Sequence, residues 1–147
     1  MGPVTSNRRY EFDWLRVLAI LVVFLYHSIL FTSSIVGVTA DPGICGYATS
    51  KHALIGLMRT VAKEVCVRNI RVNVICPGPI ENSFQADVEV ALSAVMGRNA
   101  TEVLDEATPL GRHGRAEEIA KMVVFLASDQ SSYSTGSVFM ADGGMNI

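Results

Sequence analysis

Strand-like and helix-like patterns alternate along most of this chain, and that alternation limits its fold more than any other feature. Three short runs rich in β-branched and apolar residues occur near 28–34, 70–76 and 137–141. Between the first two runs, apolar residues recur every three or four positions over 47–67, the spacing of a helix with one buried face. A second helix of this kind is predicted over 117–128. Strands that alternate with helices predict βαβ units and a parallel sheet.

The stretch from residue 81 to residue 108 does not follow this alternation. It is polar, contains short helical patches and comes after the turn-forming residues Pro77-Gly78-Pro79. We predict a mobile lobe here. Its apolar side chains indicate either a partly apolar pocket or ordinary amphipathic packing, and they are Phe84, Val88, Leu92 and Met96.

Composition excludes several classes of protein. Apolar residues make up 50% of the 147 residues and charged residues 18%, which favours a folded core over a disordered chain. The formal net charge is −2, so there is no basic excess to bind phosphates, and we expect no nucleic-acid partner. The three cysteines are widely spaced, with no histidine or cysteine at the intervals of metal ligands, so no metal site is predicted.

The N-terminal part contains the longest apolar stretch of the chain. Residues 17–36 are mainly apolar and have about the 20 residues that a helix needs to cross a bilayer. Arg8, Arg9 and Arg16 precede this stretch, as a positively charged cytoplasmic flank would. A buried strand or a core helix is the alternative, because periodicity alone does not separate these structures. We therefore predict an apolar segment that either contacts a membrane or packs on the sheet.

The segment 1–27 also resembles the opening of membrane acyltransferase family 3. The resemblance depends on Arg9, Asp13, Arg16 and His27, which flank the first transmembrane helix in that family. That family needs many spanning helices, and this sequence has one apolar run of spanning length. A histidine alone cannot transfer an acyl group, so we do not expect acyl transfer.

A tyrosine and a lysine lie one helical turn apart at the start of the first predicted helix. These residues, Tyr47 and Lys51, face the same side of the helix. A neighbouring cation favours the phenolate form of a tyrosine, so such a pair can exchange a proton with a carbonyl or alcohol oxygen. Ser34 ends the preceding predicted strand, and its hydroxyl could stabilise charge on the same substrate oxygen. The alternative for Tyr47 is a solvated residue at a helix start.

Ser34, Tyr47 and Lys51 belong to an ordered series of motifs that continues along the chain. The series comprises Ser34, Tyr47 to Lys51, Pro77-Gly78-Pro79-Ile80, Pro109 to Arg112, Glu117 to Ala120, Phe125 to Ser128 and Thr135 to Gly144. From about Ser28 to Met145 the chain resembles the C-terminal half of a short-chain dehydrogenase/reductase. The resemblance implies an α/β fold, an incomplete Rossmann-like (doubly wound) domain over 28–147 with a short parallel sheet and flanking helices. The N-terminal segment would precede it as an apolar helix.

The resemblance also implies roles for individual residues. Ser34 corresponds to the serine that orients the substrate carbonyl, and Tyr47 to the catalytic acid and base. Lys51 corresponds to the lysine that favours the phenolate and, together with Tyr47, contacts the nicotinamide ribose. The implied substrate is a small-molecule alcohol or carbonyl compound, and a homo-oligomer is the expected assembly to test.

The loop after the second strand is implied to hold the nicotinamide ring. Pro77 and Gly78 would lie along the ring, and Ile80 would contact the carboxamide through its backbone. Members of the family often have threonine two residues further on, where this chain has Asn82. Asn82 is therefore the expected substitute for the hydroxyl contact. The implied cofactor is NAD or NADP.

The Gly-rich turn that binds the pyrophosphate in this family is not found ahead of Ser34. We therefore expect weak cofactor binding and impaired activity. The alternative is a non-catalytic truncated or fused remnant that is anchored to a membrane. Two locations stay open, the cytoplasm or a membrane contacted through residues 17–36. The sequence does not identify the substrate or separate NAD from NADP.

Overall fold

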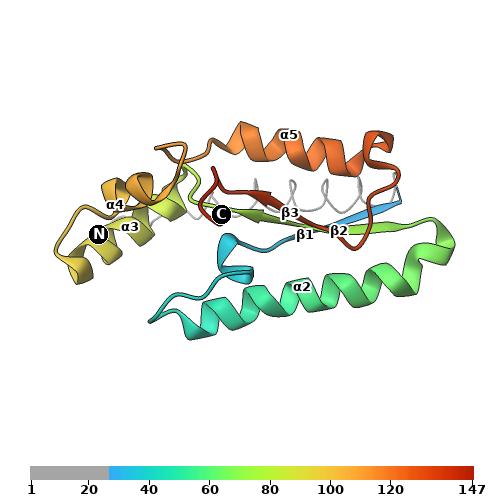
Figure 1. The fold of residues 1–147 in the computed structure, drawn as a ribbon, viewed down its shortest axis with the longest axis horizontal. Helices are drawn as coiled ribbons and strands as arrows, with labels where there is room; N and C mark the ends of the chain where they lie inside the picture. Colours follow the sequence, from blue (N-terminus) through green and yellow to red (C-terminus); the bar gives the residue numbers. More distant parts are fainter. Residues whose placement is uncertain (1–26) are drawn as a thin grey trace, which may run out of the picture.

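A three-stranded parallel sheet forms the centre of the molecule. The computed structural model describes residues 27–147, and the strands are β1 (Ser28–Thr32), β2 (Arg71–Pro77) and β3 (Val138–Ala141). They lie in the order β1-β2-β3, with both pairs parallel (Figure 1). The predicted short parallel sheet with neighbouring strands is therefore confirmed.

β2 is the central strand and the most buried. Val74 lies opposite Phe31 of β1 and opposite Val138 of β3. Every residue from Val72 to Cys76 is buried, because helices cover both faces of the sheet. This explains why the strand is a nearly continuous run of apolar residues.

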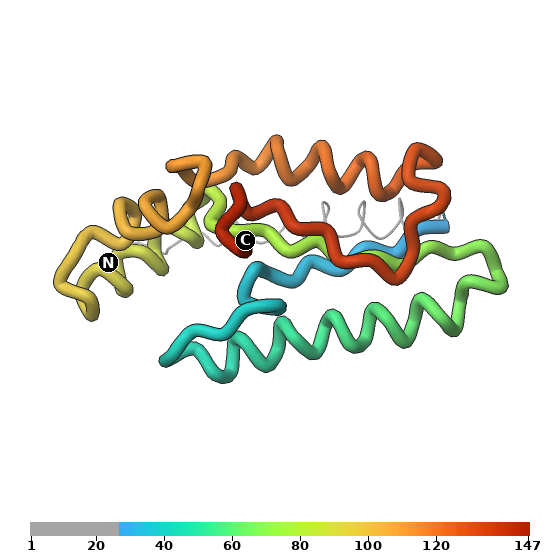
Figure 2. Tube along the Cα trace, in the orientation of Figure 1, coloured from blue at the N-terminus to red at the C-terminus, as the bar shows by residue number. Residues whose placement is uncertain are grey.

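Two long helices cover the sheet, one on each face. α2 (Cys45–Val65) packs mainly on β2 on one face, and α5 (Ala116–Ala127) packs on β1 and β2 on the other, as Figures 1 and 2 show. Both predicted helices are confirmed. α2 begins at Cys45, two residues ahead of the predicted start, so Tyr47 lies within its first turn.

The main core lies between α2 and the sheet. Its buried members are Ile55, Met58, Ala62, Val72, Val74 and Cys76. The three helical members follow the three-to-four spacing that places side chains on one helix face. Burial raises the pKa of the Cys76 thiol, which keeps this cysteine protonated.

Three short 3₁₀ helices complete the connections. They are η1 (Ile35–Gly37) after β1, η2 (Cys66–Arg68) after α2, and η3 (Asp129–Ser131) after α5. η1 packs against α2, where the hydroxyl of Ser33 donates a hydrogen bond to the Lys51 carbonyl oxygen at 2.9 Å. A Cβ on Gly37 would collide with the Ser33 hydroxyl, so this close contact requires glycine. The contact fixes the strand end next to the first turns of α2.

The region predicted as a mobile lobe consists of two capped helices. They are α3 (Ser83–Met96) and α4 (Ala100–Ala107), which lie beyond the carboxyl ends of the strands (Figure 1). The Asn82 side chain caps α3 by accepting a hydrogen bond from the Gln85 N–H at 2.8 Å. The Asn99 side chain caps α4 in the same way, from the Thr101 N–H at 3.0 Å. The caps define two helices that the weak apolar periodicity does not predict.

Replacing Asn82 by alanine is expected to destabilise the protein by about 1 kcal/mol, because the first turn of α3 loses its capping acceptor. Asn82→Asp keeps the side-chain oxygen and should retain most of the stability. Urea unfolding followed by circular dichroism measures both variants. Equal midpoints for the wild type and Asn82→Ala would exclude a capping contribution.

The last part of the predicted membrane span has a different structure. Residues 28–32 form β1, and Ser34 caps η1, so 28–36 is not part of a spanning helix. Strand pairing explains this, because β1 hydrogen-bonds to β2 along its length. His27 lies directly before β1, and its carbonyl accepts a hydrogen bond from the Arg71 N–H at 2.8 Å. The predicted apolar helix and the rest of the predicted span fall on residues 1–26, outside the described part.

No helix within residues 27–147 has both the length and the apolar character required to cross a membrane.

Candidate active site

A cavity of about 350 Å³ lies at the carboxyl ends of the strands, between the sheet and the lobe of α3 and α4. One side is formed by Ser34, Tyr47 and Gly78. The lobe contributes Phe84 and Leu104 on the opposite side. Three residues from separate parts of the sequence, two of them predicted as catalytic, therefore border one space. In open parallel sheets, ligands bind at this end of the strands.

Ser34 presents its hydroxyl at the edge of this cavity. Its backbone is extended, and its Oγ accepts a hydrogen bond from the Val36 N–H at 3.3 Å. The hydroxyl hydrogen has no acceptor among the described residues. Ser34 can therefore donate a hydrogen bond to an oxygen bound in the cavity.

Tyr47 and Lys51 lie together on the first turns of α2. The Lys51 Nζ lies 5.6 Å from the centre of the Tyr47 ring, and it donates a hydrogen bond to the Thr32 carbonyl oxygen at 3.3 Å. Tyr47 lines the cavity and is 46% exposed, so its phenol is accessible. The Thr32 contact holds the ammonium at the end of β1, beside the tyrosine.

The loop after β2 borders the same cavity through Gly78 and Pro79, while Pro77 ends the strand. The Gly78 N–H donates to the Ala141 carbonyl at 3.1 Å. A Cβ on Gly78 would lie 2.9 Å from the Cα of Asp142, so only glycine fits between this loop and the end of β3.

Ile80 and Asn82 lie away from the cavity that Ser34 and Tyr47 share. Ile80 forms an isolated β-bridge with Gly114, in which the Glu81 and Gly114 N–H groups donate, and no hydrogen bond from the Ile80 N–H occurs within residues 27–147. The Asn82 side chain caps α3 and also donates to the Ile80 carbonyl at 2.9 Å. Both ends of this amide are therefore occupied by local structure.

The lobe contributes apolar walls that the sequence indicated only in part. Phe84 and Val88 line the cavity, whereas Leu92 and Met96 do not. Leu104 of α4 is a further wall residue. The sequence did not predict this role for Leu104, because the pattern of a short helix does not show which way one leucine side chain points.

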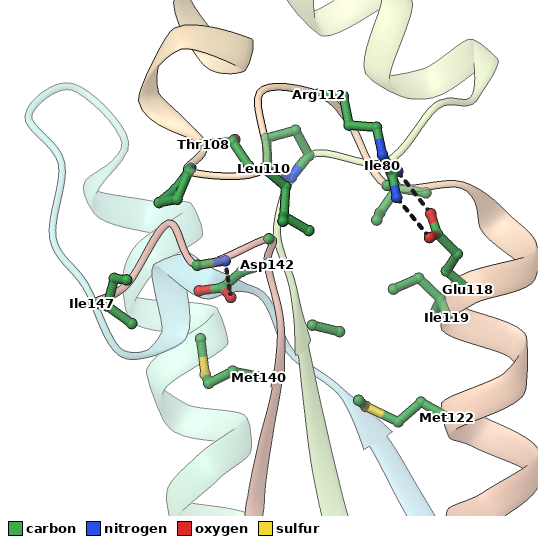
Figure 3. Close-up of a pocket in the computed structure, with 16 residues that line it drawn as sticks. Ile80, Thr108, Leu110, Arg112, Glu118, Ile119, Met122, Met140, Asp142 and Ile147 are labelled. Atoms are coloured by element: carbon green, nitrogen blue, oxygen red, sulfur yellow. Dashed lines mark hydrogen bonds and ion pairs between the residues drawn. The ribbon is translucent and has the colours of Figure 1, made fainter.

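A larger cavity of about 600 Å³ lies on the α5 side of the sheet (Figure 3). Its walls include Met122 and Met140, and an ion pair lies at its edge. Arg112 donates to both oxygens of Glu118, at 2.8 and 2.9 Å. Together with a hydrogen bond from the Arg115 N–H, these contacts lower the pKa of Glu118 to about 2.

The charged groups of the larger cavity are thus engaged in structure. The Asp142 carboxylate accepts hydrogen bonds from the Gly144 and Asn146 N–H groups, at 3.1 and 3.0 Å. Glu118 is held by Arg112. None of these groups is free for acid–base chemistry, so the smaller cavity with Ser34 and Tyr47 is the better candidate.

The family described as enoyl-(acyl carrier protein) reductase matches residues 22–146. A solved short chain dehydrogenase family protein from Francisella tularensis subsp. tularensis SCHU S4 superposes with a TM-score of 0.77 at 28% identity, over 90% of this chain and 57% of its own. The chain belongs to the short-chain dehydrogenase/reductase family. It shares the Rossmann-like fold of these reductases over the length of the match.

Two further relatives carry more specific names. The 3-oxoacyl-[acyl-carrier-protein] reductase FabG of Thermotoga maritima is 44% identical over 120 residues, which are 82% of this chain and 46% of that enzyme. The structure of 4-hydroxyisoleucine dehydrogenase complexed with NADH has a TM-score of 0.70 at 32% identity, over 92% of this chain and 54% of its own. This short-chain dehydrogenase/reductase chain therefore spans about half the length of these relatives.

The resemblance of the segment 1–27 to membrane acyltransferase family 3 is not supported. The reductase match already begins at residue 22, within the predicted transmembrane helix. His27, the histidine of that resemblance, lies where the polypeptide enters the sheet of the reductase fold.

Proposed function

We propose that this chain carries the proton-transfer site of an NAD(P)-dependent oxidoreductase that interconverts a small alcohol and its carbonyl compound. The observation that supports it best is the shared cavity of Ser34 and Tyr47, with the Lys51 ammonium beside the tyrosine ring. A hydroxyl donor, a phenol and a cation at the carboxyl ends of parallel strands are the groups that carbonyl reduction needs.

In this proposal the substrate oxygen lies between Ser34 and Tyr47. The Ser34 hydroxyl, which has no acceptor within the described residues, donates to that oxygen and stabilises the negative charge that develops on it. Tyr47 transfers its phenolic proton to the oxygen in reduction, and takes a proton from the alcohol in oxidation. Lys51 lies one helical turn away, and its positive charge attracts the negative charge that remains on the tyrosine oxygen.

NAD(P)H would supply the hydride in reduction and NAD(P)+ would accept it in oxidation, and the loop after β2 fits the nicotinamide end of such a cofactor. Gly78 and Pro79 border the cavity. Ile80 is the next residue and lines the adjoining larger cavity, and its N–H, which has no acceptor within residues 27–147, can donate to a carboxamide. Asn82 does not have this role in our proposal, because its amide caps α3. The 4-hydroxyisoleucine dehydrogenase relative, which was solved with NADH, supports a nicotinamide cofactor.

The substrate class follows from the walls of the cavity. Phe84, Val88 and Leu104 are apolar, no lysine or arginine of the described residues lines this cavity, and its charged lining residue is Asp41, which would repel a phosphate. An apolar carbonyl compound therefore fits better than a phosphorylated one. The name of the Thermotoga maritima relative, a 3-oxoacyl reductase, favours the same choice.

Cofactor titration tests this proposal. The purified chain is titrated with NADH and NADPH by cofactor fluorescence, and the reduction of a 3-oxoacyl thioester and a cyclic ketone is followed by loss of nicotinamide absorbance. We expect at least one of the two nucleotides to bind and the carbonyl group to be reduced, since Ser34 and Tyr47 share the cavity and Lys51 lies beside the tyrosine ring. A folded chain that binds neither nucleotide at millimolar concentration would overturn the proposal for this chain and favour a non-catalytic role.

Replacing Lys51 by methionine is expected to lower the rate of carbonyl reduction by at least about tenfold, because the negative charge left on Tyr47 loses its neighbouring cation. Lys63→Met is the matched control, since Lys63 is an exposed lysine in the last turn of the same helix. Initial rates from about pH 6 to about pH 9 measure both variants. Identical profiles for Lys51→Met and the wild type would exclude the proposed role.

A further inference from the structure

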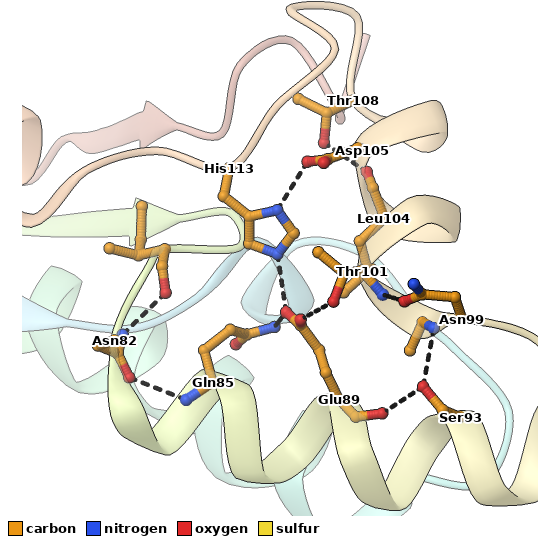
Figure 4. A network of polar contacts seen from close by, with 12 residues as sticks. Asn82, Gln85, Glu89, Ser93, Asn99, Thr101, Leu104, Asp105, Thr108 and His113 are labelled. Atoms are coloured by element: carbon orange, nitrogen blue, oxygen red, sulfur yellow. Dashed lines mark hydrogen bonds and ion pairs between the residues drawn. The ribbon is translucent and has the colours of Figure 1, made fainter.

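A buried histidine connects the two helices of the lobe to the segment that leads into α5. The side chain of His113 is 6% exposed and lies between two carboxylates (Figure 4). Its Nδ1 is 2.7 Å from Oδ1 of Asp105 on α4, and its Nε2 is 2.7 Å from Oε1 of Glu89 on α3. One imidazole ring therefore contacts both helices at once.

This geometry specifies the protonation state of the ring. A neutral imidazole has one N–H group and can donate to only one of the two carboxylates, whereas an imidazolium donates to both. Burial opposes the charge on His113, but the hydrogen bonds to Asp105 and Glu89 outweigh it, and the pKa of His113 lies above its usual value. The arrangement is a charge-assisted bridge from α3 to α4.

Glu89 is held as a carboxylate by further donors. The Gln85 amide donates to its Oε1 at 2.8 Å, and the Thr101 hydroxyl donates to its Oε2. Burial alone would raise the pKa of Glu89, but these hydrogen bonds and the one from His113 lower it. Glu89 therefore stays charged well into the acidic range.

His113 also lines a neighbouring cavity of about 350 Å³, together with two other charged groups. They are Glu81 and Arg112. Arg112 is engaged by Glu118 and also donates to the His113 carbonyl at 2.7 Å. Within the described residues, the imidazolium is thus the only cation that contacts both Glu89 and Asp105.

We propose that His113 is a positioning residue that, when protonated, holds α3 and α4 together and so fixes the apolar wall of Phe84, Val88 and Leu104 over the candidate substrate cavity. The effect on substrate binding rests on the proposed function, whereas the bridge from His113 to Glu89 and Asp105 does not. Substrate binding would therefore depend on pH, because it depends on the charge of His113.

The direction of the pH effect follows from the two shifts. The pKa of His113 is raised in the folded protein, so its contribution is complete below the unfolded value near 6.5 and is lost as the pH rises through the raised value. The pKa of Glu89 is lowered, so its contribution is lost only as the pH falls through that lowered value. The lobe is held most firmly at a pH between these two pKa values, and it loosens as the pH rises through the raised pKa of His113.

Hydrogen–deuterium exchange of the full chain tests the bridge without any ligand. After correction for intrinsic exchange, protection of α3 and α4 amides should fall several-fold relative to α2 between about pH 6 and about pH 9. In His113→Gln the protection should be low at all pH values. The matched control, Glu106→Gln, removes only the exposed ion pair of Glu106 with Arg98 and should behave like the wild type.

Titration of the His113 ring by NMR is the second readout, and it holds even where His113→Gln fails to fold. We expect a pKa above the usual histidine value, together with a drop in lobe protection at the same pH. An imidazole that titrates at or below the usual value, or lobe protection that does not change with pH in the wild type, would overturn the inference.

Kinetics separate this inference from the proposed function. In His113→Gln the KM for an apolar ketone should rise several-fold while kcat changes less, since the wall and not the proton-transfer site is disturbed. If the wild type shows no reduction but the exchange results are as expected, the proposed function fails and the bridge stands. If reduction occurs and KM is unaffected by His113→Gln, the coupling to the substrate cavity is wrong.

Discussion

Replacing Tyr47 by phenylalanine is expected to lower the rate of carbonyl reduction by about 10²–10⁴-fold, the usual contribution of a positioned acid–base group. The substitution removes one oxygen atom from a side chain that is 46% exposed, so the fold should persist. Ser34 and the cavity walls stay in place, and substrate affinity should change little. Single-turnover and steady-state rates with a saturating ketone measure the loss.

Tyr133→Phe is the matched control for this experiment. Tyr133 is fully exposed and follows η3, which lies at the end of the sheet away from α3 and α4 (Figure 1). The same atom is removed, so Tyr133→Phe should retain wild-type rates. If Tyr47→Phe keeps the wild-type rate as well, proton transfer does not pass through Tyr47 and the proposed mechanism is wrong.

The regular elements could be predicted because their signals are local. β2 is rich in β-branched residues and is buried by the helices on both faces of the sheet. The apolar residues of α2 recur every three or four positions, which places them on one helix face. Parallel pairing of the three strands then follows from the βαβ order and the handedness of such crossovers. Ser34 follows the end of β1, and Tyr47 lies in the first turn of α2. Both positions could be located from the sequence, because the ends of these two elements have local signals.

The lobe could not be predicted at the same level, since its structure depends on contacts between distant residues. α3 has exposed apolar residues such as Val90 and Val95, so its periodicity does not indicate a buried face, and α4 is only eight residues long. The contacts that join α3 to α4 include the bridge through His113, which lies far from Glu89 in sequence. No spacing rule links these residues.

Asn82 shows a different limit of sequence reasoning. The family pattern implied a polar contact to the cofactor at this position, whereas the structure uses its oxygen as a helix cap and its NH₂ as a donor to the Ile80 carbonyl. Asparagine is a preferred capping residue, so the signal was present. Both interpretations require a short polar side chain after a turn, so the sequence alone does not separate a helix cap from a contact to a cofactor.

Replacing Met58 by alanine is expected to cost about 2–5 kcal/mol of unfolding free energy, the largest effect on stability among the substitutions considered. Met58 is fully buried and lies in the layer between α2 and the sheet, together with Val72 and Val74. Truncation leaves a cavity there that the surrounding strand and helix cannot fill. Urea unfolding gives the free energy directly.

Met58→Leu tests whether the loss comes from the cavity, because leucine conserves most of the volume and should cost less than about 1.5 kcal/mol. The same core fixes the distance between α2 and β1, and with it the approach of Lys51 to the Thr32 carbonyl. Met58→Ala should therefore also reduce carbonyl reduction at temperatures where the variant is still folded, while Met58→Leu should not. A fully active Met58→Ala variant with lowered stability would show that η1 and the Ser33 contact alone hold α2 in register.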